Sequence, residues 1–255
     1  MNRLQPGTRY WEIDTLRGIA VVLMVLYHFV WDLTYFKVYH ANMLAGPWYI
    51  FARTIGSTFI FLLGVSLTLD YARHQTMRLQ GSSSEILFKR YLLRGVKIFG
   101  WGMVITLVTY VVIGRGFVIF GILHLLGCSS ILAYPFLWYR AWVSLLVGLA
   151  IIGCGVYLSS VLVSFPWLIW LGLAQRGVYM SDYYPLVPWF GLVLVGISAG
   201  YTLYQQGIRR FTLPDCSNIS VVRMLRFLGK HSLVIYLLHQ PILLALLMSL
   251  GFGSL

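Results

Sequence analysis

The stretch from residue 12 to residue 32 constrains the fold most, because it places ionisable groups at both ends of an apolar run. Of the ten residues between Arg17 and His28, eight are aliphatic or methionine. A helix rises about 1.5 Å per residue, so Arg17 and His28 would lie about 16 Å apart along its axis. That is roughly half of a ~30 Å hydrocarbon core. The stretch therefore predicts a membrane-spanning helix with ionisable side chains at two depths.

The composition indicates a membrane protein with several spans. The chain of 255 residues is 59% hydrophobic and 10% charged, with a mean hydropathy of +0.81, whereas about a quarter of the residues of soluble domains are charged. Seven apolar segments are long enough to cross a membrane, and they cover roughly residues 15–35, 47–69, 92–113, 117–137, 142–163, 186–205 and 232–250. We expect an all-α, polytopic transmembrane helix bundle that forms a single domain over residues 1–255.

The basic residues predict how the chain is oriented. Fourteen of the 19 Lys and Arg residues lie in residues 1–14, 71–97 and 206–230 or at Arg140, which alternate with the apolar segments. Cytoplasmic loops carry an excess of Lys and Arg, so this side is the cytoplasm, the N-terminus lies inside and the C-terminus outside. The net charge of +12 therefore reflects topology. We expect no nucleic acid partner, because there is no soluble basic module to bind one.

His28 and Asp32, near the outer end of the first span, form the strongest candidate site. Being four residues apart, they share one helix face. A carboxylate beside an imidazole can hold it in one tautomer and raise its basicity, as a general base requires. Ionisable residues at membrane depth are costly and mark function. A histidine and an aspartate can also tie helices together by hydrogen bonds, and the sequence leaves both interpretations open.

Four other polar residues are candidates for substrate binding. They are His124 in FGILHLLG, His239 in IYLLHQPI, Arg53 in the second span and Asp182 in the outer loop before the sixth span. A buried arginine needs a carboxylate, and Arg53 could pair with Asp32 or Asp182. Each histidine could instead hydrogen-bond between helices. The spacing of these residues predicts no metal site, and the chain contains no HExxH motif.

Aromatic residues gather in the outer stretch 164–185. They are Trp167, Trp170, Tyr179, Tyr183 and Tyr184. Trp and Tyr are enriched where a membrane meets water, so they can form an interfacial belt. The alternative is that they line a site for a sugar-like acceptor.

Five segments of the chain resemble one protein family. RYWEIDTLRGIAVVLMVLYHFVWDL, FLLGVSLTLDYAR, FGILHLLG, DYYPLVPWFGLVLVGISAGY and LGKHSLVIYLLHQPIL are similar to the bacterial proteins grouped with the catalytic domain of heparan-alpha-glucosaminide N-acetyltransferase. The ten-residue spacing between Arg17 and His28 also resembles the hallmark of the integral-membrane acyltransferase-3 proteins.

The resemblance implies a multi-pass acyltransferase of the bacterial cytoplasmic (inner) membrane. Such an enzyme takes acetyl-CoA or another acyl-CoA from the cytoplasm and transfers the acyl group to a hydroxyl or amine of a glycan on the far side. Guanidinium and ammonium groups suit the phosphates of coenzyme A. The candidates for this role are Arg17, Lys89, Arg90 and Arg94.

The resemblance offers two histidines as the catalytic one. His28 has the acyltransferase-3 spacing, and there it would act as general base or carry the acyl group, with Asp32 orienting it. In the animal lysosomal member of the family, asparagine stands at the position that matches His28, and the catalytic histidine lies in the first lumenal loop. His40 occupies the corresponding loop here. We favour His28 because of its spacing from Arg17.

Two other classes of function compete with the acyltransferase. A proton-coupled transporter would use His28, Asp32, His124 and Asp182 as a proton relay. A non-catalytic membrane scaffold would need these residues for packing alone. The sequence also leaves open whether the chain forms a homodimer.

Overall fold

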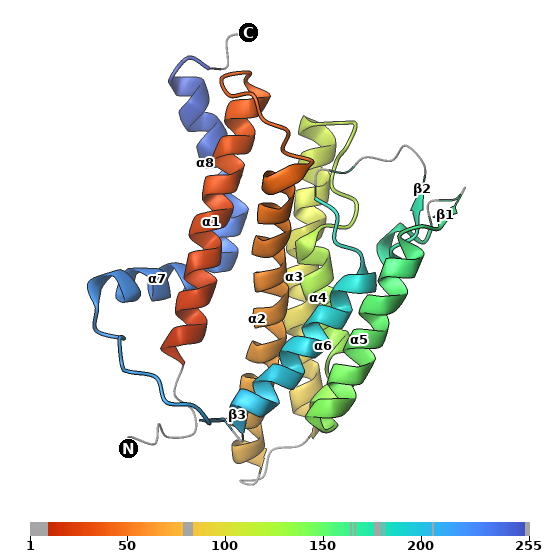
Figure 1. Ribbon diagram of the computed structural model, residues 1–255, viewed down its shortest axis with the longest axis vertical. Coiled ribbons are helices and arrows are strands. Elements are labelled where there is room, and N and C mark those ends of the chain that lie inside the picture. The colour runs from red at the N-terminus through yellow and green to blue at the C-terminus, as the bar shows by residue number, and fades with distance from the viewer. Residues whose placement is uncertain are drawn as a thin grey trace. The chain divides into compact units, whose positions relative to one another are not determined.

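The computed structural model describes residues 10–78, 84–163, 165, 167–175, 180, 182–205 and 207–252. Its elements, shown in Figure 1, are α1 (Trp11–Tyr35), α2 (Gly46–Arg78), α3 (Ser84–Val112), α4 (Ile122–Leu132), η1 (Pro135–Trp138), α5 (Ala141–Leu158), β1 (Leu162–Val163), η2 (Ile169–Leu171), β2 (Ala174–Gln175), α6 (Leu186–Leu203), β3 (Tyr204–Gln205), β4 (Ile208–Arg209), α7 (Ser220–Lys230) and α8 (Ser232–Ser249).

The long helices confirm the predicted all-α membrane fold. Within the described residues, six helices are long and apolar enough to cross a membrane, namely α1, α5, α6, α8, residues Gly46–Gln75 of α2 and Leu87–Val112 of α3. The four strands form two ladders of two residue pairs each, β1 with β2 and β3 with β4. These ladders lie in the connections between helices, so they do not change the fold class.

The segment predicted as a span over residues 117–137 is largely non-helical at its start. The helix α4 has 11 residues, which is about 16 Å of length. Gly121 is extended, with φ −93° and ψ −174°, so the helix begins one residue later. Pro135 has no N–H to continue an α-helix, and the 3₁₀ helix η1 begins there. These backbone constraints shorten a helix that hydropathy alone predicted to be longer.

The same segment nevertheless runs the length of α6. The N–H of Tyr184, just before α6, donates to the Phe120 carbonyl at 3.1 Å. At the other end, the hydroxyl of Tyr201, in the last turn of α6, donates to the Leu137 carbonyl. Residues 120–137 therefore carry the chain from one end of α6 to the other, as a seventh crossing segment would.

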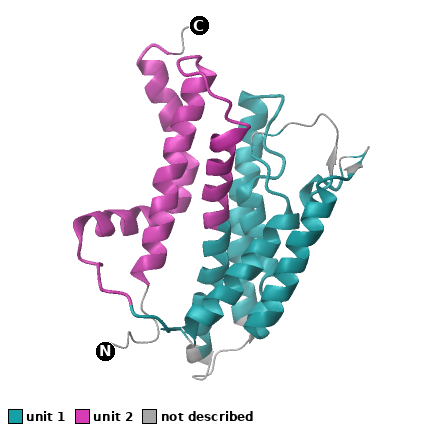
Figure 2. Cartoon of the chain, in the orientation of Figure 1, with its two compact units in different colours: residues 1–8, 60–212 teal, residues 9–59, 213–255 magenta. Residues whose placement is uncertain are grey.

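The chain divides into two compact units, coloured in Figure 2. One contains residues 1–8 and 60–212, and the other contains residues 9–59 and 213–255. We refer to them as unit 1 and unit 2. The helix α2 contributes residues to both.

Glycines let the helices of unit 1 approach closely. A Cβ atom at Gly148 in α5 would lie 2.7 Å from the Gly191 carbonyl oxygen in α6, and one at Gly95 in α3 would lie 2.7 Å from the Gly127 carbonyl oxygen in α4. Membrane helices associate through such small residues, because apolar side chains gain little by leaving lipid for protein. These contacts therefore fix which helices of unit 1 are neighbours.

Basic stretches of unit 1 meet at one of its ends. The Arg90 guanidinium, near the start of α3, lies 3.8 Å from the Asp70 carboxylate near the end of α2. A Cβ atom at Gly207 would touch Ala72 at 3.6 Å, which brings the turn between β3 and β4 to the same end. Arg140 follows η1, which lies beside the last turn of α6. The stretches that the charge pattern assigns to one membrane side thus lie together.

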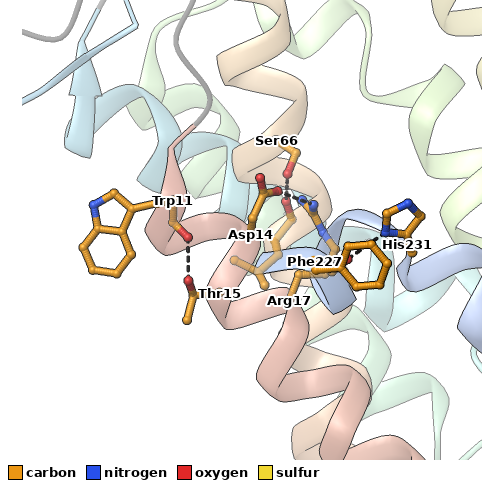
Figure 3. A network of polar contacts seen from close by, with 8 residues as sticks. Trp11, Asp14, Thr15, Arg17, Ser66, Phe227 and His231 are labelled. Atoms are coloured by element: carbon orange, nitrogen blue, oxygen red, sulfur yellow. Dashed lines mark hydrogen bonds and ion pairs between the residues drawn. The ribbon is translucent and has the colours of Figure 1, made fainter. Parts of the chain in front are cut away.

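In unit 2, the helix α7 crosses the beginning of α1 at two glycines. A Cβ atom at Gly18 would clash with the Leu225 carbonyl oxygen, and one at Gly229 would clash with the Asp14 carbonyl oxygen. Beside this crossing the Arg17 guanidinium donates to the Asp14 carboxylate at 3.1 Å (Figure 3). The close crossing holds α7 against the first turns of α1.

Two glycines of α5 should respond differently to alanine. Gly148→Ala inserts a methyl group against the Gly191 backbone, and overpacking of this kind destabilises by about 1–3 kcal/mol. At Gly153 a Cβ atom would meet no side chain or neighbouring element of the described chain within 4 Å, so Gly153→Ala should leave the melting temperature unchanged or raise it slightly. Thermal unfolding of both variants in detergent measures the difference. Equal melting temperatures would contradict the close approach of α5 and α6.

The predicted orientation can be tested with reporter fusions. Alkaline phosphatase, which is active outside the cytoplasm, should be active when fused after Gly116 or after Leu255 and inactive when fused after Gly207. Green fluorescent protein should give the opposite pattern. Phosphatase activity after Gly207 would show that the basic end of unit 1 is not cytoplasmic.

Candidate functional site

Four polar side chains from α1 and α8 meet in unit 2, and we refer to them as the α1–α8 cluster. The rings of His28 and His239 lie with their centroids 4.6 Å apart and nearly perpendicular, at 79°. One turn further along α1, the Asp32 carboxylate accepts a hydrogen bond of 2.6 Å from the side-chain amide of Gln240. Asp32 and His239 are buried, with 2% and 8% of their surface exposed. The cluster therefore joins residues that are far apart in the sequence.

Backbone hydrogen bonds assign the same tautomer to both histidines. The Nδ1 atom of His28 lies 2.9 Å from the Met24 carbonyl oxygen, and that of His239 lies 2.7 Å from the Tyr236 carbonyl oxygen. A carbonyl oxygen can only accept, so each Nδ1 carries a proton and donates it. In a neutral ring the Nε2 atom then holds a free lone pair. Both rings are thus set up as bases at Nε2.

Three atoms of the α1–α8 cluster are buried and hydrogen-bonded to no described residue. They are Oδ2 of Asp32, Nε2 of His239 and Oε1 of Gln240. With Asp32 ionised, all three are acceptors. Leaving such groups buried and unsatisfied costs about 1–3 kcal/mol each. The cluster is therefore complementary to a molecule that brings several O–H or N–H groups.

Aromatic rings cluster around Tyr27, which contacts His28. Tyr27 packs edge-on against His28 with ring centroids 5.5 Å apart, and it also contacts Trp31, Trp48 and Phe51 at 6.1 to 6.5 Å. The helical spacings 27/31 and 48/51 put each pair on one helix face, so the sequence contained this signal. We did not select these residues from the sequence, and we predicted the aromatic lining in the outer loop instead.

Gln240 is the polar member of the cluster that we did not predict from the sequence. It follows His239 directly and precedes Pro241 within α8. An uncharged polar residue in an apolar helix is a weak signal by itself, because a neighbouring helix often satisfies it. Its role becomes visible when α8 is placed beside α1.

His124 and Asp182 lie in unit 1 and organise the start of α4. The Gly121 N–H donates to Nδ1 of His124 at 3.1 Å, and Nε2 of His124 lies 3.3 Å from the Thr106 hydroxyl. Asp182 accepts from the Ile122 N–H at 3.0 Å, as carboxylates do at helix N-termini. Both nitrogens of His124 are thus engaged. This geometry supports the interpretation that His124 hydrogen-bonds between helices. The role of His124 and Asp182 in substrate binding stays a prediction.

Two further candidates of unit 2 lie outside these contacts. The Arg53 guanidinium sits 5.1 Å from the centroid of the Tyr49 ring. The Oδ1 atom of Asp32 accepts a hydrogen bond from Gln240. The pairing of Arg53 with Asp32 or Asp182 stays a prediction. His40 is exposed in the loop after α1.

The basic candidates for coenzyme A binding occur in both units. Arg17 pairs with Asp14 near the start of α1. Lys89, Arg90 and Arg94 are exposed in the first turns of α3, and Arg90 contacts Asp70 and His74. Exposed guanidinium and ammonium groups can bind phosphates. Within the described residues, no group of three or more His, Cys, Asp or Glu side chains could hold a metal ion.

The aromatic residues of the outer loop do not share one environment. Trp167 and Trp170 are 78% and 45% exposed, which fits an interfacial belt. The Tyr183 hydroxyl donates to the Ile169 carbonyl at 2.8 Å, and Tyr184 is buried. Tyr179 lies outside the described residues.

Comparison with known proteins identifies the family. A family model described as heparan-alpha-glucosaminide N-acetyltransferase, catalytic, matches residues 9–241. Comparisons with curated proteins and with solved structures found no match. The matched region includes every residue of the α1–α8 cluster, and the long apolar helices agree with a multi-pass membrane protein. The chain therefore belongs to the heparan-alpha-glucosaminide N-acetyltransferase catalytic family, whose members are membrane acetyltransferases.

Proposed function

We propose that the chain transfers an acetyl or other short acyl group from cytoplasmic acyl-CoA to a hydroxyl or amine of an extracytoplasmic glycan. The observation that supports this most directly is the α1–α8 cluster, whose unsatisfied atoms are hydrogen-bond acceptors. A glycan carries several neighbouring hydroxyl or amine hydrogens and can satisfy all of them. The family supplies the reaction class, and the cluster supplies the chemistry that fits it.

The reaction needs a base close to the acceptor. The acceptor hydroxyl or amine donates its hydrogen to an Nε2 lone pair, and its oxygen or nitrogen attacks the thioester carbonyl carbon. The carbon–sulfur bond then breaks, and the imidazolium returns the proton to the leaving thiolate, which gives free coenzyme A and the acylated acceptor. A positioned base of this kind accelerates such reactions by about 10²–10⁴-fold.

The members of the cluster have different tasks in this proposal. His28 acts as the general base, and the perpendicular ring of His239 accepts a second hydrogen from the acceptor. Asp32, fixed through Oδ1 by Gln240, accepts a further hydrogen bond at Oδ2. The aromatic side chains that contact Tyr27 provide an apolar surface next to His28.

The donor would enter from the other end of α1. Arg17 lies eleven residues before His28, about 16 Å along the helix, so phosphates bound at Arg17 and a thioester near His28 can belong to one extended molecule. The excess of Lys and Arg favours a cytoplasmic location for that end of α1, and the membrane that we propose is the bacterial inner membrane. Lys89, Arg90 and Arg94 are further candidates for the phosphates.

The first test is acyl-CoA hydrolysis and binding by purified protein in detergent. Wild type should bind acetyl-CoA saturably and cleave it slowly, and His28→Ala should lower cleavage at least about 100-fold, since general-base catalysis is lost. His40→Ala should leave cleavage unchanged. Loss in His40→Ala alone would move the chemistry to the loop after α1.

The same preparation distinguishes the transporter. Absence of saturable binding by any acyl-CoA, together with substrate-dependent proton flux in vesicles, would overturn the enzyme proposal. A scaffold predicts neither acyl-CoA cleavage nor proton flux, and it predicts that His28→Ala leaves every phenotype of the cell intact.

A second test addresses the acceptor site. Gln240→Leu removes the amide that fixes Asp32, and loss of a hydrogen bond to a charged group weakens binding by about 10- to 100-fold. We expect the KM for the acceptor to rise by that factor, while water-dependent acyl-CoA cleavage changes less. Gln75→Leu is the matched control, because that amide donates to the Tyr71 hydroxyl within α2. Equal effects of both variants would contradict the role of Gln240.

A further inference from the structure

The helix α7 occupies an unusual place in unit 2. One residue, His231, separates it from the spanning helix α8. It packs across the first turns of the spanning helix α1, where Gly229 meets the Asp14 backbone (Figure 1). With 11 residues, it is about 16 Å long and too short to span a membrane. It therefore lies where two spanning helices begin.

Around its axis, α7 has a face that packs on α1, an exposed apolar arc and a basic arc. At about 100° per residue, Val222, Leu225 and Gly229 fall on one face, and this face packs on α1. Val221, Met224 and Phe227 fall on a second arc and are 61%, 56% and 60% exposed. The basic residues of α7 fall on a third arc. The apolar arc and the basic arc lie on opposite sides of the face that packs on α1.

The basic arc contains Arg223, Arg226 and Lys230. Arg223 donates to the Asn218 carbonyl at 3.1 Å, and Arg226 donates to the Ser217 carbonyl at 3.2 Å. Each guanidinium has five N–H donors, so these bonds hold the side chains beside the preceding turn without exhausting them. Arg223 and Lys230 are exposed.

We propose that α7 lies in the membrane surface and binds anionic phospholipid headgroups. A helix with an apolar arc and a basic arc settles at the boundary between headgroups and acyl chains. Here the apolar arc faces the acyl chains, and Arg223 and Lys230 face the lipid phosphates. Since α1 and α8 begin at this level, α7 needs no movement to reach the surface. The proposal is independent of the acyl transfer reaction.

Adjacent cysteines on the two arcs test the orientation. In a full-length chain whose three native cysteines are replaced by alanine, R223C should react with a water-soluble maleimide in opened membrane fragments. M224C, one residue away on the apolar arc, should react at least about tenfold more slowly, because a thiol among acyl chains is shielded from water. Equal rates would overturn the proposal.

The lipids that the purified protein retains test whether the basic arc of α7 binds anionic headgroups. Purified protein is mixed with equal amounts of phosphatidylglycerol and phosphatidylcholine, and the retained lipids are counted by native mass spectrometry. Wild type should prefer phosphatidylglycerol, and R223Q/K230Q should lower that preference roughly thirty-fold, since each basic residue contributes about a factor of five. The control R140Q/R210Q removes two exposed charges outside α7.

Each outcome of the lipid experiment either supports or overturns the binding of anionic lipid by α7. A preserved preference in the control with a loss in the α7 variant supports the proposal. Equal losses in both variants would show that net charge alone attracts the lipid. A dimer that dissociates in M224Q would show that the apolar arc binds a second copy of the chain.

Discussion

Inside a bilayer, polar groups must find their partners within the protein, and this constraint accounts for many side-chain hydrogen bonds of the described helices. Hydroxyl groups in the spans donate to carbonyls of their own helix, as Thr68 does to Gly64 at 3.1 Å. His124 uses both ring nitrogens at the start of α4. Each of these bonds replaces one that water would otherwise provide. The spans can therefore remain apolar toward lipid and satisfied within.

The α1–α8 cluster gathers three of the buried polar atoms that have no hydrogen bond to a described residue. The side chains of His28, Asp32 and Gln240 make hydrogen bonds to described residues, yet buried acceptor atoms without such a bond remain at Asp32, His239 and Gln240. Exceptions of this kind are expected at functional sites, because local stability is given up for binding or catalysis. His124, whose two ring nitrogens are both engaged, differs in this respect from His239, whose Nε2 atom has no hydrogen bond to a described residue.

Sequence patterns predicted the helices of the chain better than the contacts between them. Apolar runs identified six long helices, since hydropathy over about 20 residues reports directly on spanning length. The predicted length of α4 was wrong. The extended backbone at Gly121 delays the start of the helix, and Pro135 cannot continue it, and hydropathy reports neither effect. The pairing of Asp32 with Gln240 joins residues 208 positions apart, and no local pattern encodes that. The candidate pair His28 and Asp32 followed from helical spacing, whereas Gln240 needed the structure.

The histidine tautomers have a consequence for motion. Each imidazole of the α1–α8 cluster is oriented by a carbonyl of its own helix, Met24 for one and Tyr236 for the other. A shift of α8 along α1 would change the gap between the two rings, but it would not exchange the protonated and unprotonated nitrogens. If the two helices part to admit a bulky molecule, each base therefore keeps its own proton arrangement.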